Sequence, residues 1–310
     1  MMEKYVENMT RRMPIEKISI VLKLLLIIIL AFGKISVNTY AKTINETLKK
    51  YPNDILDTNK IKDIDYLKKT FFSIDPWTDI LPSDIDVTNY LNDDLTISVD
   101  GNKPKVLIIH SHASELYVDS QCIDDGVIAV GSKLSEALNK QYSIPNIHDI
   151  TAYDIVNGEF HHDGAYTRVR DSVVQTLNEN PSIEIIIDLQ RDGVPQDIKY
   201  VTKVNSKPTA QINFVNGLSR IYENGVLQPT EEYPNSFVLK NLSFSFNMQL
   251  AANTFFPNFA RKIYIAPYNY SLNLLPKSLL IYVGAQTNTK QEAENAAPLI
   301  AEILAYNVMN

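Results

Sequence analysis

Two histidines and a glutamate directly follow one short apolar stretch of the chain. His110, His112 and Glu115 come after "KVLII". Two imidazoles and a carboxylate this close together could bind a divalent metal, most naturally zinc. The chain has only five histidines, so two in one motif favour a ligand role. The alternative is that both are polar loop residues without a ligand role.

A second group of polar residues ends the stretch "IIIDLQRDG". Its three consecutive isoleucines predict a buried strand. Alternation along a strand places Asp188, Gln190 and Asp192 on one face. The neutral amide oxygen of Gln190 is a poor zinc ligand. The two aspartates could orient histidines that bind a metal, or they could pair with Arg191.

A third candidate position ends the stretch "LLIYVGAQTNT". Tyr282 lies near the end of this predicted strand, before a polar turn. A tyrosine there can pack against neighbours, donate a hydrogen bond or stack on a ligand, and packing is the most common of these roles.

The elements that must position these residues alternate between strands and helices. This pattern predicts an α/β fold with a mainly parallel sheet and helices on both faces. In such sheets, ligands bind and functional residues lie at the carboxyl ends of the strands. The predicted strands are 105–110, 146–151, 183–189, 210–217 and 278–284, and the predicted helices are 127–142, 165–180, 236–255 and one that starts after Thr289 in a capping box.

The N-terminus resembles an export signal. Arg11, Arg12 and Lys17 precede the apolar run "ISIVLKLLLIIILAFG". We expect residues 1–41 to be either a signal peptide cleaved after Ala41 or a membrane anchor, so the protein is anchored on the extracytoplasmic face of the membrane or secreted.

The rest of the chain is expected to form two parts. Residues 42–102 are polar and interrupted, which predicts a linker or stalk with short helices, and 103–310 form the α/β domain. The lone Cys122 leaves no intramolecular disulfide. The net charge of −7 argues against a nucleic-acid partner.

Several of these motifs together resemble a known family. The segments "KVLIIHSHASELY", "IHDITAYD", "YTRVRDSVVQTLNENPSIEIIIDLQRDG" and "SLLIYVGAQTNTKQEAENAAPLIAEIL" are similar to stage II sporulation protein P. The similarity extends from Lys103 to Ala305. It implies a peptidoglycan-hydrolysing protein related to the zinc-dependent N-acetylmuramoyl-L-alanine amidases, which cleaves the amide between glycan and stem peptide. It also implies an N-terminal membrane segment and a partner glycan hydrolase.

The resemblance assigns roles to particular residues. The family's "HTH..ES" motif corresponds to His110, His112 and Glu115, which are candidate metal ligands, with Glu115 also a candidate catalytic residue. The family's "DLHRDG" reads "DLQRDG" here, so Gln190 replaces the expected histidine. The family's "LLIEVG" reads "LLIYVG", so Tyr282 replaces the glutamate expected to act as general base.

Both replacements predict an impaired site, because a weakened ligand set binds zinc less well and a neutral phenol does not replace a carboxylate base. Zinc is then weak or absent, and the protein becomes a binding or regulatory module that acts with a catalytic paralogue or the partner hydrolase. The alternative is an active zinc amidase with a rearranged ligand set. Its additional imidazoles would be His148, His161 and His162, and its substitute base Glu115, Glu159 or Asp163.

Overall fold

The computed structural model describes residues 55–232 and 234–309. The expected signal or anchor in residues 1–41 lies outside the described residues. Among those that are described, no helix has the length and apolar character needed to cross a membrane.

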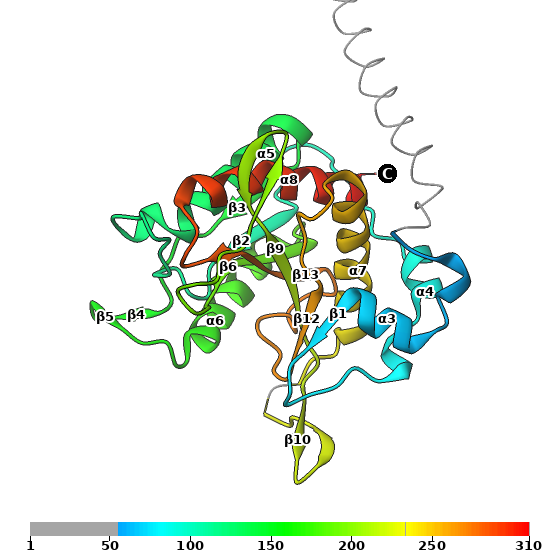
Figure 1. The fold of residues 1–310 in the computed structure, drawn as a ribbon. Helices are drawn as coiled ribbons and strands as arrows, with labels where there is room; N and C mark the ends of the chain where they lie inside the picture. The colour runs from blue at the N-terminus through cyan, green and yellow to red at the C-terminus, as the bar shows by residue number, and fades with distance from the viewer. Residues whose placement is uncertain (1–54, 233, 310) are drawn as a thin grey trace, which may run out of the picture. The chain divides into compact units, whose positions relative to one another are not determined.

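A sheet of seven strands is the centre of the described part of the chain (Figure 1). The apolar runs that the sequence shows for the central strands are buried in it, including every residue of β2 and β9. In their order across the sheet, the strands are β1 (Phe72–Ile74), β12 (Ile263–Ala266), β9 (Ile212–Gly217), β13 (Ser278–Ala285), β6 (Ile185–Asp192), β2 (Val106–Ile109) and β3 (Asn146–His148).

The sheet is mostly parallel, as predicted. Neighbouring strands run parallel everywhere except between β9 and β13, which are antiparallel. The strands β2, β6 and β13 therefore end at the same edge, and they carry the three candidate motifs. The strand β6 extends through Asp192, further than predicted, so Gln190 and Arg191 lie on the strand itself.

Helices pack on both faces of the sheet, which confirms the predicted layers. In Figure 1, α5 (Val127–Tyr142) and α8 (Lys290–Val308) lie above the sheet and α6 (Ala165–Glu179) lies below it. The face with α6 buries Val169 and Val173 of that helix against Leu107 and Ile186 of the sheet. The helix α7 (Val238–Phe255) contacts α8 and the strands β9 and β13. The predicted capping box begins α8, with Thr289 as N-cap.

Residues 55–102 are not a free linker, which corrects that prediction. They include the short helices α3 (Ile64–Phe71) and α4 (Val87–Asn92), and they supply the edge strand β1 of the main sheet. Phe71 and Phe72 are buried against Phe246 of α7. The segment has no core of its own, so its apolar side chains complete the core of the α/β unit.

Four further features lie outside the predicted pattern. The strand β12 was missed, although "KIYIAP" is a short apolar run. Three small hairpins were missed as well, because their strands of two to four residues bury little surface and show weak alternation. These are β4 (Ile155–Val156) with β5 (Glu159–Phe160), β7 (Val201–Val204) with β8 (Lys207–Ala210), and β10 (Arg220–Glu223) with β11 (Val226–Pro229).

Candidate functional site

His110 points into the core rather than into the site. Its Nδ1–H donates to the carbonyl oxygen of Leu189 at 2.6 Å, so the lone pair is on Nε2, which lies 2.8 Å from Nε2 of His148. Burial and the neighbouring His148 lower the pKa of His110 to about 3, which keeps the ring neutral. Both ring nitrogens of His110 are therefore engaged.

This histidine pair needs a glycine on α5. A Cβ atom on Gly131 would lie 2.6 Å from Nε2 of both His110 and His148. We expect Gly131→Ala to lower the free energy of unfolding by about 1–3 kcal/mol through overpacking, despite a gain of up to about 1 kcal/mol in helix propensity. Urea unfolding measures this effect. The exposed Ser132→Ala on the same helix controls for propensity, and equal stability of the two variants would contradict the packing argument.

His112 faces a different set of side chains. Its ring stacks on the ring of His162, with centroids 4.1 Å apart and planes 14° apart, and it meets Tyr166 edge-on at 5.1 Å. Its Nδ1 is buried and has no hydrogen-bond partner among the described residues. Burial and His162 lower the pKa of His112 to about 4. His112 is thus a neutral imidazole with an unused nitrogen.

Asp188 organises a buried hydrogen-bond network behind these residues. Its carboxylate accepts from the backbone N–H of Ser111 at 3.0 Å and from the Ser111 hydroxyl at 2.5 Å. The Gln190 side chain also bonds to Asp188, and its Nε2 lies 3.4 Å from the hydroxyl of Tyr166. Two members of the predicted row on β6, Asp188 and Gln190, are thus in contact. In this row, Gln190 links Asp188 to Tyr166.

Glu115 approaches the end of β6 from the loop after β2. Its Oε2 accepts from the backbone N–H of Arg191 at 3.3 Å, while Arg191 Nε donates to the carbonyl oxygen of Leu116 at 3.0 Å. Burial raises the pKa of Glu115 to about 7, and the Arg191 charge opposes that shift. Asp192 pairs with Arg261 at 2.8 Å instead of with Arg191.

Tyr282 lies directly beside Gln190. The two residues are register partners on the parallel strands β13 and β6. Burial raises the pKa of Tyr282 far above the ordinary value for tyrosine, and nearby acidic and phenolic groups raise it further. The phenol is therefore neutral and cannot accept a proton as a general base.

The structure brings together most of the residues that the sequence singled out. His112, Glu115, Gln190 and Tyr282 lie at the shared end of β2, β6 and β13, whereas His110 turns away toward α5. Sequence reasoning missed Tyr166, whose ring contacts His112 and whose hydroxyl contacts Gln190. It lies at the start of a helix without a capping motif, so no local signal marks it.

The loop before α6 holds the remaining histidines. His162 covers His112, while His161 is exposed and lies 4.0 Å from Glu159. A second buried carboxylate, Asp154, accepts from the backbone N–H and hydroxyl of Ser114 and so fixes the loop that follows β2.

The side chains at this site do not fit a zinc ion. Catalytic zinc sites use three protein ligands from imidazole and carboxylate groups, and no group of three such residues able to hold a metal occurs in the described part of the chain. An imidazole lone pair lies in the plane of its ring. The parallel rings of His112 and His162 therefore cannot direct lone pairs to one ion.

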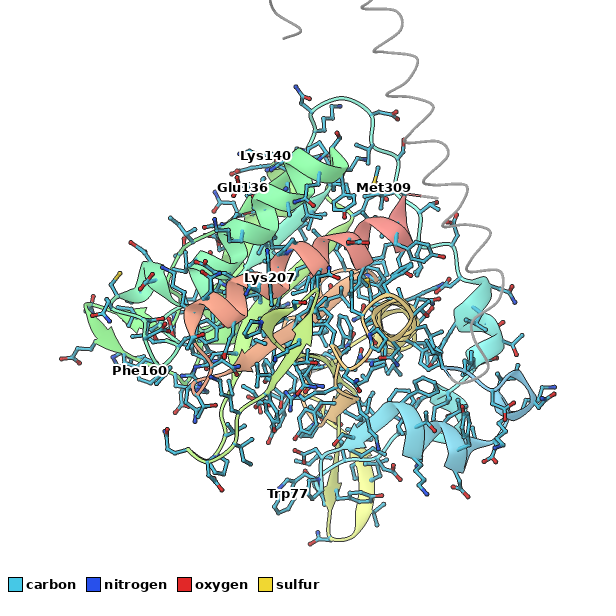
Figure 2. The ribbon with its side chains drawn as sticks, turned by 45° about the horizontal axis from the view of Figure 1, so that its top comes forward. Trp77, Glu136, Lys140, Phe160, Lys207 and Met309 are labelled. Carbon is cyan, nitrogen blue, oxygen red and sulfur yellow. The ribbon has the colours of Figure 1, made fainter. Side chains whose placement is uncertain are left out.

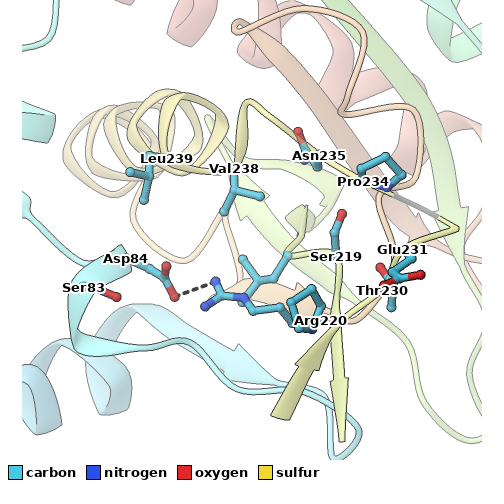
Figure 3. Close-up of a pocket in the computed structure, with 12 residues that line it drawn as sticks. Ser83, Asp84, Ser219, Arg220, Thr230, Glu231, Pro234, Asn235, Val238 and Leu239 are labelled. Carbon is cyan, nitrogen blue, oxygen red and sulfur yellow. Dashed lines mark hydrogen bonds and ion pairs between the residues drawn. The ribbon is translucent and has the colours of Figure 1, made fainter.

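A separate cavity of about 520 Å³ lies at the first turn of α7 (Figure 3). Arg220 and Asp84 form an ion pair of 2.7 Å at its wall, and the hydroxyl of Ser219 is buried there without a hydrogen-bond partner among the described residues. The candidate residues at the ends of β2, β6 and β13 do not line this cavity.

Three solved structures that are similar to this chain are N-acetylmuramoyl-L-alanine amidases. One from Clostridium difficile 630 is 15% identical, with 67% of this chain and 96% of that chain covered and a TM-score of 0.39. The CwlD amidase from Clostridioides difficile, solved in complex with the GerS lipoprotein, is 13% identical, with 66% and 95% covered and a TM-score of 0.39. AmiC2 of Nostoc punctiforme is 11% identical, with 68% and 97% covered and a TM-score of 0.39.

Those identities and TM-scores are low, so membership rests on the comparison with protein families. The stage II sporulation protein P family matches residues 35–305, which is most of the chain and includes all three strand-end motifs. None of the curated proteins matches the chain. The chain therefore belongs to the stage II sporulation protein P family.

Proposed function

We propose that this chain is an exported, peptidoglycan-facing member of its family whose amide hydrolysis is lost or strongly reduced, and that it acts as a binding or regulatory module. The observation that carries the proposal is the adjacent pair Gln190 and Tyr282 on β6 and β13. Both side chains are neutral where the resemblance implies a metal ligand and a general base.

The chemistry of the pair supports this proposal. Loss of a general base typically costs about 10² to 10⁴-fold in rate, and an amide oxygen is a poor substitute for imidazole at zinc. Glu115 is an alternative carboxylate at this end of the sheet, but its Oε2 accepts a hydrogen bond from the backbone N–H of Arg191. If Glu115 bound zinc, His112 would be the one other candidate ligand of the family's motifs beside it.

The proposed setting is the extracytoplasmic face of the membrane, to which the apolar segment in residues 1–41 delivers or anchors the protein. Peptidoglycan is the proposed ligand. The proposed protein partner is a catalytic paralogue or a partner glycan hydrolase. A regulatory module that does not hydrolyse peptidoglycan itself can act only through an enzyme that does.

The proposal is tested on the full-length chain in detergent. We expect sedimentation with insoluble peptidoglycan, less than about a tenth of an equivalent of zinc after incubation and desalting, and no release of soluble fragments above that of the His112→Ala variant. Mass spectrometry measures the metal, and dye-labelled peptidoglycan measures release. Near-stoichiometric zinc with clear hydrolysis would overturn the proposal in favour of the rearranged ligand set.

A further inference from the structure

A row of aromatic side chains continues from the candidate site across the sheet. We call it the aromatic strip and define it as Trp77, Tyr264, Tyr268, Tyr270 and Tyr282. Three of these rings, on Tyr264, Tyr270 and Tyr282, pack against the same apolar cluster on the α6 side of the sheet. Trp77 lies at the far end, beside the hairpin of β10 and β11 (Figure 2).

Ring contacts connect the strip to the candidate site. Tyr270 meets Tyr166 edge-on, with centroids 5.5 Å apart, and meets Tyr268 at 6.1 Å. Tyr166 in turn contacts His112 and Gln190. The strip therefore begins at the strand-end site and leads away from it.

The side chains of the aromatic strip are partly exposed to solvent. Trp77 is 64% exposed and Tyr268 is 42% exposed, while Tyr264, Tyr270 and Tyr282 are half-buried. Tyrosine and tryptophan are enriched in binding interfaces relative to the rest of a protein surface.

The backbone at the centre of the strip adopts an unfavourable conformation. Tyr270 has φ of 49° and Ser271 has φ of 59°, so two consecutive residues other than glycine lie in the left-handed region. Residues other than glycine rarely adopt this conformation, and it is kept where other contacts hold it, often at binding sites. Here the Ser271 hydroxyl lies 3.3 Å from that of Ser111, and the strained turn presents the Tyr270 ring beside Tyr166.

The polar groups beside the rings include a carboxylate that accepts hydrogen bonds and an arginine held in an ion pair. Asp75 accepts from the backbone N–H of Trp77 at 2.8 Å and from the Tyr264 hydroxyl. Arg261 is held by its ion pair with Asp192, and its guanidinium lies 3.5 Å from the centroid of the Tyr200 ring. A ligand rich in hydroxyl groups would thus find carboxylate and phenol oxygens next to aromatic faces.

A glycan chain has this chemistry. The C–H faces of a pyranose ring can stack on tyrosine and tryptophan, and its hydroxyl and amide groups can bond to carboxylates and phenols. We propose that the aromatic strip binds the glycan chain of peptidoglycan and not its stem peptide. This inference rests on the proposed function, because it names the part of the polymer that the same surface recognises.

The test compares two soluble probes on the full-length chain in detergent. One is a hexamer of N-acetylglucosamine, and the other is a free stem peptide, each titrated by isothermal calorimetry. We expect the hexamer to bind, and Trp77→Ala and Tyr270→Ala each to weaken it roughly five-fold or more, as removal of a contact aromatic does. Ile150→Ala is the matched control, because Ile150 is 57% exposed and follows β3 at the opposite edge of the sheet.

Thermal unfolding of every variant distinguishes a loss of binding from a loss of folding. Trp77→Ala is less able to destabilise the fold than Tyr270→Ala, because Trp77 is exposed and Tyr270 is half-buried. Binding of the stem peptide but not the hexamer, or hexamer binding that the strip variants leave unchanged, would overturn the inference. Hydrolysis of peptidoglycan would overturn the proposed function instead, while strip-dependent hexamer binding would still support the glycan assignment.

Discussion

The double change Gln190→His and Tyr282→Glu is expected to convert this chain into a zinc-binding amidase. The two positions are register partners on β6 and β13, and His112 lies across Tyr166 from them with an unused ring nitrogen. In the variant, the new histidine at position 190 would join His112 and Glu115 to give two imidazoles and a carboxylate, which is a common catalytic zinc set, and the new glutamate at position 282 would be the general base. We expect about one zinc per chain by mass spectrometry and a rise of at least about 10²-fold in peptidoglycan solubilisation.

The control for this result is the same double change with His112→Ala added. It should bind no zinc, because only two of the three ligands remain. His110 should not rescue it, since both of its nitrogens are engaged by Leu189 and His148. A folded double variant that takes up no zinc would show that the ligand assignment is wrong.

Phe71→Ala is expected to destabilise the whole α/β unit by about 3–5 kcal/mol, which is the usual cost of removing a buried phenylalanine. Phe71 is 1% exposed, and its ring lies 5.0 Å from that of Phe246 at the centre of α7. Urea unfolding followed by circular dichroism measures the loss. The large effect is expected because residues 55–102 complete the core that α7 shares with the sheet.

Trp77→Ala is the matched control in the same segment. Its side chain is 64% exposed, so we expect a change within about 0.5 kcal/mol. If Phe71→Ala were equally mild, residues 55–102 would be a linker that merely lies against the unit, and their place in the sheet would not contribute to stability.

The layered architecture could be predicted from the sequence because its signals are local. Continuous apolar runs indicated β2, β6 and β13, and the mixed stretch "AQINFVNG" indicated β9. Periodic apolar residues indicated the long helices, and the Thr289 capping box placed the start of α8. The edge strand β1 and its neighbour β12 were missed because each is only three or four residues long. Such strands are decided by pairing with distant segments, and short segments carry little pattern of their own.

The residue types at the three strand ends were also accessible from the sequence. A row of polar residues on β6 follows from alternation, and the two departures at Gln190 and Tyr282 can be read directly from the motifs. Their adjacency required the register of β6 and β13, which depends on packing across the sheet.

The sequence by itself determined the α/β class, the family motifs and the two neutral replacements, because these depend on residue identity and short-range periodicity. Only the tertiary structure decided that His110 turns to His148 while His112 faces Tyr166. The two histidines are two residues apart in a loop, and contacts from α5, β3 and α6 orient their rings. The aromatic strip likewise arises only when β1, β12, β13 and the loop before β13 meet, since its members are scattered from Trp77 to Tyr282.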